Sequence, residues 1–212
     1  MLQKSQFSIL LLLVAICVFP SCKDGRKNRT EQSKAPENEV KVPLRAPEQE
    51  IPPAATHEEQ LFREACMQGL AAEVQKYLDS GVDPAAADGD GRTGLMLAAF
   101  NGHADIVKML LDRDVPVNKT DLSGRTALMY ASTGHFPETV ETLLTGGADP
   151  NLADHQEGFT ALMFAAAEGN ARVVRLLLDH GANPDTKDID GDTAETFALQ
   201  NGHTEVAEML AQ

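Results

Sequence analysis

Four variants of one phrase recur along the chain at an almost constant interval. They carry Thr93, Thr126, Thr160 and Thr193, which lie 33, 34 and 33 residues apart. A period of this length is typical of arrays of small helical units, in which no unit buries its apolar face alone and each stacks on its neighbours. The chain is therefore constrained to fold as a stack. The phrases are GRTGLMLAAFNGH (91–103), GRTALMYASTGHF (124–136), GFTALMFAAAEGN (158–170) and GDTAETFALQNGH (191–203).

Each phrase leads into a second apolar stretch, so each repeat is predicted to hold two short helices. These stretches are DIVKMLL, ETVETLL, RVVRLLL and EVAEML. Helices of about ten residues are not stable alone in water, and stacking is again required. Upstream, residues 58–88 fit the same frame, with Val74 placed 33 residues before Val107. The array thus spans residues 57–212 in five repeats, which are 57–89, 90–122, 123–156, 157–189 and 190–212.

This frame resembles the ankyrin repeat. That family has a Gly, one variable residue, a Thr-Pro-Leu-His phrase, two alanines, Gly-His, a second helix, Gly-Ala and a closing Asn before a hairpin. The repeats follow this order over about three-quarters of the chain. The resemblance implies an all-α solenoid of paired antiparallel helices with projecting β-hairpin loops, and a module that binds proteins through the hairpin tips and the concave face.

The recurring residues have physical roles within the frame. Each threonine is predicted to cap the free N–H groups of the first helix, and the leucine two residues later is predicted to enter the core. Pairs of small residues let neighbouring helices approach closely, and glycines end helices in the left-handed conformation. Methionine stands where the family has histidine, so apolar packing is expected in place of a side-chain hydrogen bond. The residues concerned are Leu95, Leu128 and Leu162, Ala98, Ala99, Ala165 and Ala166, Gly81, Gly102, Gly147, Gly169 and Gly181, and Met96, Met129 and Met163.

Departures from the frame predict local changes. Asp114 replaces the glycine of a left-handed cap, at a cost on the order of 1 kcal/mol. His135 occupies a glycine position before Phe136-Pro137, which predicts a remodelled turn in the third repeat, and one extra residue within 155–157 lengthens the third hairpin. The end repeats are expected to present polar faces, which terminal repeats need for solubility. These faces carry Arg63 and Glu64 in the first repeat and Glu195 and Thr196 in the last.

The chain begins with an apolar segment that is predicted to be a signal peptide, residues 1–21. Lys4 precedes an apolar stretch from Phe7 to Phe19, which is shorter than the roughly 20 residues that span a bilayer. Its end, VFPSC, resembles the lipobox of bacterial lipoproteins, and the resemblance implies lipidation of Cys22. Lys23 in place of an Asp favours the outer membrane, with the protein facing the periplasm or the cell surface. Conventional cleavage and an uncleaved anchor remain alternatives.

Residues 22–56 are predicted to be a disordered linker. Five prolines and almost no large apolar side chains occur there, so burial cannot offset the entropy of ordering the chain. The basic residues at its start are expected either to contact anionic headgroups or to be solvated. They are Lys23, Arg26, Lys27 and Arg29.

The net charge argues against nucleic acid as a partner. It is −14 for the whole chain, and residues 57–212 carry 26 acidic and 10 basic side chains, or −16. A phosphate backbone is bound mainly by Lys and Arg. The sequence therefore excludes nucleic-acid binding as a main function.

Residues with catalytic or metal-binding potential have structural interpretations. His103 and His203 lie three repeats apart, too far for one zinc ion. The spacing of Asp188, Asp190 and Asp192 does not match an EF-hand loop. Cys66 occupies the position of Ala99 and is interpreted as core filling. No cofactor, metal or catalytic residue is predicted, and the chain is not expected to be an enzyme.

The binding residues are predicted from positions that the frame leaves exposed, at the hairpin tips and at the end of each first helix. Leu122, Phe159 and Ile189 are expected to be exposed anchors, because hairpin tips that face solvent have no folding reason to be apolar, and aromatic and arginine side chains dominate binding energy; the alternative is that they cover neighbouring hairpins. The predicted set is Asp90, Arg92, Phe100, Asn101, Leu122, Ser123, Arg125, Thr133, His155, Glu157, Phe159, Glu168, Ile189, Asp190, Asp192 and Gln200.

The sequence predicts a non-catalytic, monomeric module that is tethered to the bacterial envelope and binds an unidentified protein. A secreted effector or toxin-associated factor that acts on another cell is the alternative. An enzyme of unrecognised type is a third hypothesis, and no residue constellation favours it.

Overall fold

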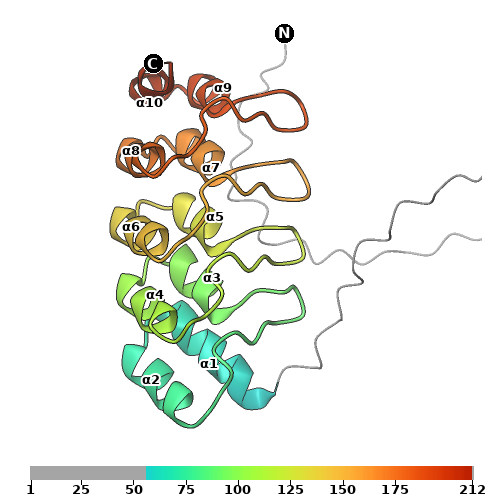
Figure 1. The fold of residues 1–212 in the computed structure, drawn as a ribbon, viewed down its shortest axis with the longest axis vertical. Coiled ribbons are helices and arrows are strands. Elements are labelled where there is room, and N and C mark those ends of the chain that lie inside the picture. The colour runs from blue at the N-terminus through green and yellow to red at the C-terminus, as the bar shows by residue number, and fades with distance from the viewer. Residues whose placement is uncertain (1–55, 212) are drawn as a thin grey trace, which may run out of the picture. The chain divides into compact units, whose positions relative to one another are not determined.

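Figure 1 shows the protein as a computed structural model, which describes residues 56–211. The predicted signal peptide and Cys22 lie outside the described residues, as does the predicted linker except for Thr56.

The described residues form ten helices in five pairs, which confirms the predicted all-α solenoid. In Figure 1 the pairs stack from α1 and α2 at the bottom to α9 and α10 at the top, and the loops between pairs project to one side. The helices are α1 His57–Gln68, α2 Ala71–Asp79, α3 Gly94–Phe100, α4 Ala104–Leu111, α5 Ala127–Ser132, α6 Pro137–Thr145, α7 Ala161–Ala167, α8 Ala171–Asp179, α9 Ala194–Gln200 and α10 Thr204–Leu210.

The helices form two layers. The first helices of the pairs pack in the order α1, α3, α5, α7 and α9, beside the projecting loops, and form the inner layer. The second helices, α2, α4, α6, α8 and α10, form the outer layer. None of the helices within residues 56–211 has the length and apolar character needed to cross a bilayer.

Threonine caps start the inner helices, as predicted. The hydroxyls of Thr93, Thr126, Thr160 and Thr193 each accept the backbone N–H three residues later. Thr56 does the same for α1, and the Glu59 carboxylate accepts the Thr56 N–H at 2.8 Å to complete a capping box.

The methionines behave only partly as expected. Met96, Met129 and Met163 are all buried. In addition, the sulfur atoms of Met96 and Met163 accept the Thr93 and Thr160 N–H groups at 3.5 Å. The thioether thus keeps a weak form of the hydrogen bond that it was expected to replace.

The core runs between the layers through the whole stack. Leu95, Leu128 and Leu162 are each 1% exposed, and the alanine pairs of α3 and α7 are fully buried, as predicted. Burial of this kind is the main source of stability, at about 25 cal/mol per Å² of apolar surface. Each pair of helices therefore depends on its neighbours.

Left-handed residues end the helices where the frame predicted them. Asp114 has φ 58° and is the one non-glycine residue with positive φ among residues 56–211. It stands in the position of Gly147 and Gly181, whose φ angles are 89° and 85°.

The turn of the third repeat is remodelled, as predicted. Helix α5 has six residues, against seven in α3, α7 and α9. Gly134 does not take the positive φ of Gly102. Phe136 takes the place of His103, and its ring lies against Gly102 of the preceding repeat. Pro137 then opens α6, where its missing N–H costs nothing.

The expectation of a polar first repeat is wrong for Arg63. This side chain is only 5% exposed, and its Nη1 has no hydrogen-bond partner among the described residues. Arg63 stands in the position of Met96, which faces the core in that repeat and in the next two, so its register places it inside. Glu64, one residue on, is exposed as expected.

Candidate partner-binding surface

Four loops project beside the inner layer, and we call their tips fingers: finger 1 (residues 88–92), finger 2 (121–125), finger 3 (154–159) and finger 4 (188–192). An aspartate opens each finger and holds its shape. In finger 1, Asp88 Oδ1 accepts the N–H groups of Asp90 at 3.0 Å and Arg92 at 2.8 Å. The same oxygen of the opening aspartate accepts two N–H groups in fingers 2 and 4. The tips are thus fixed locally by the sequence.

Finger 3 is one residue longer, as predicted. Its closing bond runs from the Asp154 N–H to the Phe159 carbonyl, five residues on, whereas in finger 1 the span from Asp88 to Arg92 is four. Asp154 Oδ1 accepts three N–H groups, from Glu157, Gly158 and Phe159. The insertion is absorbed at the tip without breaking the stack.

Backbone hydrogen bonds join the fingers into one row. The Leu122 N–H donates to the Asp90 carbonyl at 3.0 Å, and the His155 N–H donates to the Ser123 carbonyl at 2.8 Å. The Ile189 N–H donates to the Glu157 carbonyl at 3.0 Å. We call these bonds the finger ladder, and they hold the tips in fixed positions relative to one another.

The predicted binding residues divide into two groups. Apart from Gln200 at the end of α9, the exposed residues lie at the finger tips, and Leu122 and Ile189 are 62% and 67% exposed. The other group lies half-buried where the fingers meet the inner layer. The exposed group is Asp90, Leu122, His155, Glu157, Ile189, Asp190 and Gln200. The half-buried group is Arg92, Phe100, Asn101, Ser123, Arg125, Thr133, Phe159, Glu168 and Asp192.

The expectation that Phe159 is an exposed anchor is wrong. Its ring packs edge to face on Phe164 and Phe197, with ring centres 5.6 and 5.1 Å apart. It belongs to the partly buried apolar residues that pack on the core. Phe159 therefore attaches finger 3 to α7 and α9, which is the alternative role of covering a neighbour.

Arg125 also has a structural role. Its Nε lies 3.6 Å from Asp154 Oδ2, and that carboxylate is fully buried. Its guanidinium lies over the Phe164 ring, 5.3 Å from the centre. Charge and cation–π attraction thus join finger 2 to finger 3 and α7.

Arg92 forms ion pairs within its own finger. Its Nε lies 2.9 Å from Asp88 Oδ2 and its Nη2 lies 3.0 Å from Asp90 Oδ2. Partial burial opposes its charge, but the hydrogen bond and the two carboxylates outweigh burial and raise the pKa of Arg92. Finger 1 therefore carries an internal guanidinium.

Sequence reasoning missed a row of large side chains on the inner layer. Each stands four residues after a capping threonine, and this shared position was the available signal. The Tyr130 hydroxyl donates to Asp121 Oδ2 at 2.7 Å, and its ring meets Phe100 edge to face at 6.1 Å. Burial and the Asp121 carboxylate raise the pKa of Tyr130. The row is Leu97, Tyr130, Phe164 and Phe197.

Residues at the ends of the inner helices serve as caps. Asn101 Nδ2 donates to the Leu97 carbonyl at 3.2 Å, and the Thr133 hydroxyl donates to the Tyr130 carbonyl at 2.8 Å. Glu168 is the C-cap residue of α7. These residues border the surface but are partly committed to the helix ends.

The histidines and the cysteine have the predicted structural roles. His103 Nε2 lies 3.1 Å from the Met67 carbonyl, and His203 Nε2 lies 3.1 Å from the Ala167 carbonyl, so each joins adjacent repeats. Cys66 is fully buried, and burial raises the pKa of its thiol to about 12, partly opposed by Arg63. Within residues 56–211, no group of three or more His, Cys, Asp or Glu residues forms a metal site.

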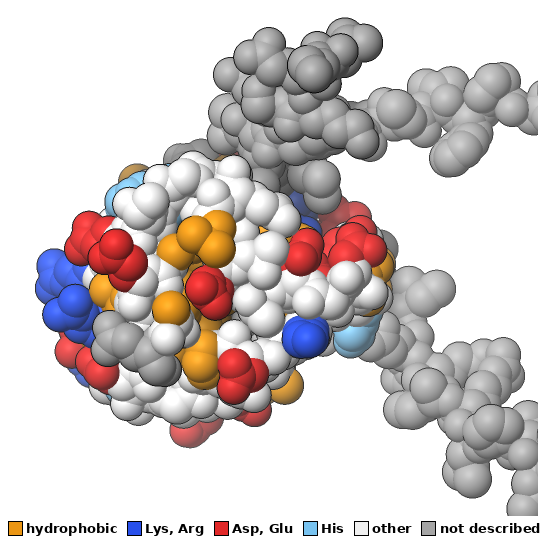
Figure 2. All heavy atoms as spheres, turned by 90° about the horizontal axis from the view of Figure 1, so that it is seen from above, with side chains coloured by type: hydrophobic (Ala, Val, Ile, Leu, Met, Phe, Trp, Pro, Cys, Tyr) orange, Lys and Arg blue, Asp and Glu red, His pale blue; other side chains and the backbone are white. Residues whose placement is uncertain are grey.

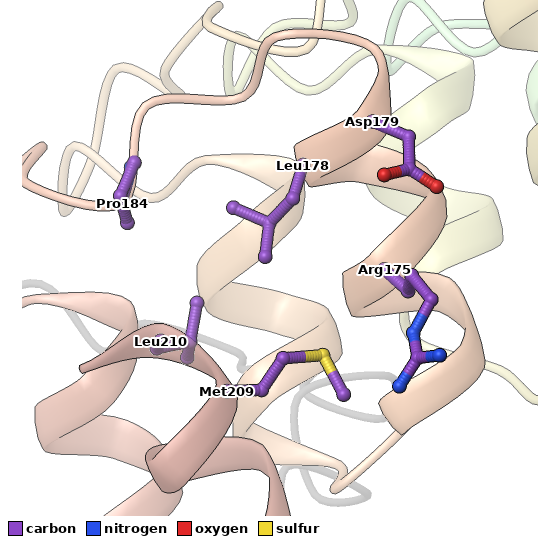
Figure 3. A pocket seen from close by; sticks show the side chains of 6 residues that line it. All are labelled: Arg175, Leu178, Asp179, Pro184, Met209 and Leu210. Carbon is purple, nitrogen blue, oxygen red and sulfur yellow. The ribbon is translucent and has the colours of Figure 1, made fainter. Parts of the chain in front are cut away.

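Two cavities lie away from the fingers. Figure 3 shows one of about 400 Å³ between α8 and α10, where Leu178, Met209 and Leu210 converge, with Arg175, Asp179 and Pro184 around them. The second, of about 520 Å³, lies at the remodelled turn beside Phe136 and Arg172. Neither brings together residues of the predicted binding set.

Figure 2 looks onto the end of the stack formed by α9, α10 and finger 4. Hydrophobic side chains are scattered across the middle of this face, and acidic side chains lie among them and around the rim, on the helix side as well as on the finger side. Leu199 of α9 is 57% exposed. This end is therefore partly apolar, with acidic side chains spread over it.

The comparisons with known proteins agree with the geometry. A family model described as ankyrin repeats (3 copies) matches residues 62–154 and 134–212. A search of curated proteins gave no match. Repeats of this family suggest a protein–protein interaction module.

Proposed function

Since this chain belongs to the ankyrin repeat family, we propose that it is a non-catalytic module that binds one protein partner through its fingers and the adjoining inner layer. The observation that carries the proposal is the exposure of Leu122 and Ile189, at 62% and 67%, on tips that the finger ladder holds in place. Rigid apolar tips lose little entropy on binding. The exposed side chains of Leu122 and Ile189 are therefore better explained by contact with a partner than by a role in folding.

The reactive side chains support a non-catalytic role. The pKa of the buried Cys66 thiol is raised to about 12, so almost no thiolate is present at neutral pH. Nε2 of His103 and of His203 lies against a backbone carbonyl of the preceding repeat. These contacts give the two histidines a role in joining adjacent repeats.

The proposal includes attachment to the bacterial envelope through lipidated Cys22 and residues 22–56. Its support is the sequence VFPSC after an apolar stretch, followed by a proline-rich segment. Metabolic labelling with a fatty acid is expected to mark the wild-type chain and not Cys22→Ser. Release of an unlabelled wild-type chain into the medium would instead favour the secreted effector.

A pull-down from the envelope of the host tests the binding function. The full chain and its Leu122→Ser/Ile189→Ser variant serve as baits, with Leu70→Ser as the matched control. Leu70 is exposed and apolar but is the N-cap residue of α2, outside the fingers and the inner layer. The double variant is expected to recover the partner at least about tenfold less, because buried apolar anchors dominate interface energy. Equal recovery by all three baits would contradict the proposed surface.

A further inference from the structure

The finger ladder has an open edge at finger 4. The carbonyls of Asp90, Ser123 and Glu157 each accept an N–H from the next finger. Asp190 holds the same position in finger 4, and no N–H of residues 56–211 donates to its carbonyl. An unpaired acceptor at the edge of a hydrogen-bonded row is a template for another extended backbone.

Finger 1 shows how this kind of tip holds an arginine. There Arg92 contacts Asp88 Oδ2 and Asp90 Oδ2 at 2.9 and 3.0 Å. Finger 4 repeats the two carboxylates as Asp188 and Asp190, on a matching backbone. Its opening aspartate accepts N–H groups at 3.0 and 2.8 Å, the same two distances as in finger 1.

Finger 4 lacks the cation that finger 1 contains. Asp192 stands in the position of Arg92, and no described residue forms an ion pair with Asp188 or Asp190. The side chain between the two carboxylates is Ile189, which is 67% exposed. The tip therefore combines an empty place for a guanidinium, an apolar contact and a free backbone acceptor.

The charge of the array favours a basic protein over a second copy of this chain. Residues 57–212 carry 26 acidic and 10 basic side chains, so two copies repel each other while a basic partner is attracted.

We infer that finger 4 binds an extended, arginine-bearing segment of a basic partner protein. The segment donates one backbone N–H to the Asp190 carbonyl, places its guanidinium between the carboxylates of Asp188 and Asp190, and packs an apolar neighbour on Ile189. This inference rests on the proposed protein-binding function and names the partner chemistry at one end of the binding surface.

A peptide titration followed by NMR tests the inference. The full chain, labelled with ¹⁵N, is titrated with acetyl-Gly-Val-Arg-Val-Gly-amide and with the same peptide carrying Gln in place of Arg. The Arg peptide is expected to shift the amide signals of residues 188–193 and to leave those of residues 88–93 in place. The Gln peptide is expected to bind roughly tenfold more weakly, because a charge-assisted bidentate contact is lost.

Exchanging the residues at positions 92 and 192 between the two fingers gives a matched pair of variants. Asp192→Arg gives finger 4 the internal arginine of finger 1 and is expected to abolish binding of the Arg peptide. Arg92→Asp removes the arginine from finger 1 and is expected to create no more than weak binding there, because the Asp90 carbonyl already accepts the Leu122 N–H and Gly89 stands in the position of Ile189. Both changes are at half-exposed loop positions, and the unperturbed spectrum outside each finger verifies that the variants are folded.

Three outcomes would overturn the inference: Arg and Gln peptides of equal affinity, full binding by Asp192→Arg, or self-association of the wild-type chain through finger 4 in sedimentation. The pull-down separates this failure from failure of the proposed function. A partner that is lost with Leu122→Ser/Ile189→Ser but retained by Asp192→Arg leaves the binding module standing and removes the arginine site.

Discussion

Fingers 1 and 4 have the same hydrogen-bonding pattern and different charges. In both, the first aspartate accepts the N–H groups two and four residues later at 3.0 and 2.8 Å. The residue before the capping threonine is Arg92 in finger 1 and Asp192 in finger 4. The arginine pairs with both carboxylates of its tip, whereas the aspartate adds a third negative charge. The scaffold thus tolerates reversal of charge at this position, which leaves it available for recognition.

A second contrast is one of burial, between helix pairs that the next repeat covers and the last pair, α9 and α10. Interior positions are covered by the next repeat, while the equivalent positions of the last repeat are open. Cys66 and Leu199 hold one helix position, yet their exposed fractions are 0% and 57%. The same substitution can be made at a covered position and at the equivalent open position of the last repeat. The difference between the two losses in the free energy of unfolding measures what packing against the next repeat contributes.

The largest difference is expected between the aspartates that open fingers 3 and 4. Asp154→Ala leaves three N–H groups and the half-buried Arg125 guanidinium without their buried carboxylate, and is expected to cost about 4 kcal/mol. Asp188→Ala affects a more exposed tip and is expected to cost about 1 kcal/mol. Urea unfolding of the full chain measures both. Equal losses would show that cover by the next repeat does not matter at the fingers.

A second pair compares two glycines at the same turn. Gly102 and Gly202 have φ 77° and 81°, and a Cβ at Gly102 would meet the Phe136 ring, while none of the described atoms lies within 4 Å of one at Gly202. Gly102→Ala is expected to cost about 3 kcal/mol, from strain plus overlap. Gly202→Ala is expected to cost about 1 kcal/mol, from strain alone. A larger loss at Gly202, read from thermal unfolding, would contradict the comparison.

Features that depend on one repeat alone could be predicted from the sequence, and contacts between repeats could not. The caps, the buried leucines and the left-handed Asp114 depend on residues within a few positions of each other, and the 33-residue frame predicted them. The placement of Phe159 depends on Phe197 in the next repeat and on the longer finger 3. The burial of Arg63 follows from its register, whereas the sequence argument considered only its polarity. Contacts between repeats are therefore the part that local pattern does not determine.

The pH dependence of stability at alkaline pH tests the burial of the Cys66 thiol. Its folded pKa of about 12 exceeds the value of about 8.5 for an unfolded thiol, so its contribution is complete below about pH 8.5 and is lost as the pH rises toward 12. Between pH 9 and 10, the wild-type free energy of unfolding is expected to fall by about 1.2 kcal/mol more than that of Cys66→Ala. Parallel pH profiles would contradict the burial of the thiol.

The smallest effect is expected at Asp114. Its φ of 58° is strained for a residue with a Cβ, and the equivalent residues 147 and 181 are glycines. Asp114→Gly is expected to raise the free energy of unfolding by about 1 kcal/mol, less the greater entropy of the unfolded glycine. Gly181→Asp, the reverse change at the same position, is expected to lower it by a similar amount. A loss of stability in Asp114→Gly would show that the aspartate makes a compensating contact.

Site-specific photo-crosslinking in the host tests the central claim that the fingers form the partner-binding surface. Each variant carries one photoreactive residue. In the finger variants it replaces Gly89, Leu122, His155 or Ile189, which hold equivalent positions in the four fingers, and in the outer-layer variants it replaces Lys108, Glu141 or Arg175, which hold equivalent positions in α4, α6 and α8. The account predicts one crosslinked partner from the finger positions, with the highest yield at Ile189, and none from the outer layer. A partner crosslinked from the outer layer and not from the fingers would contradict the account.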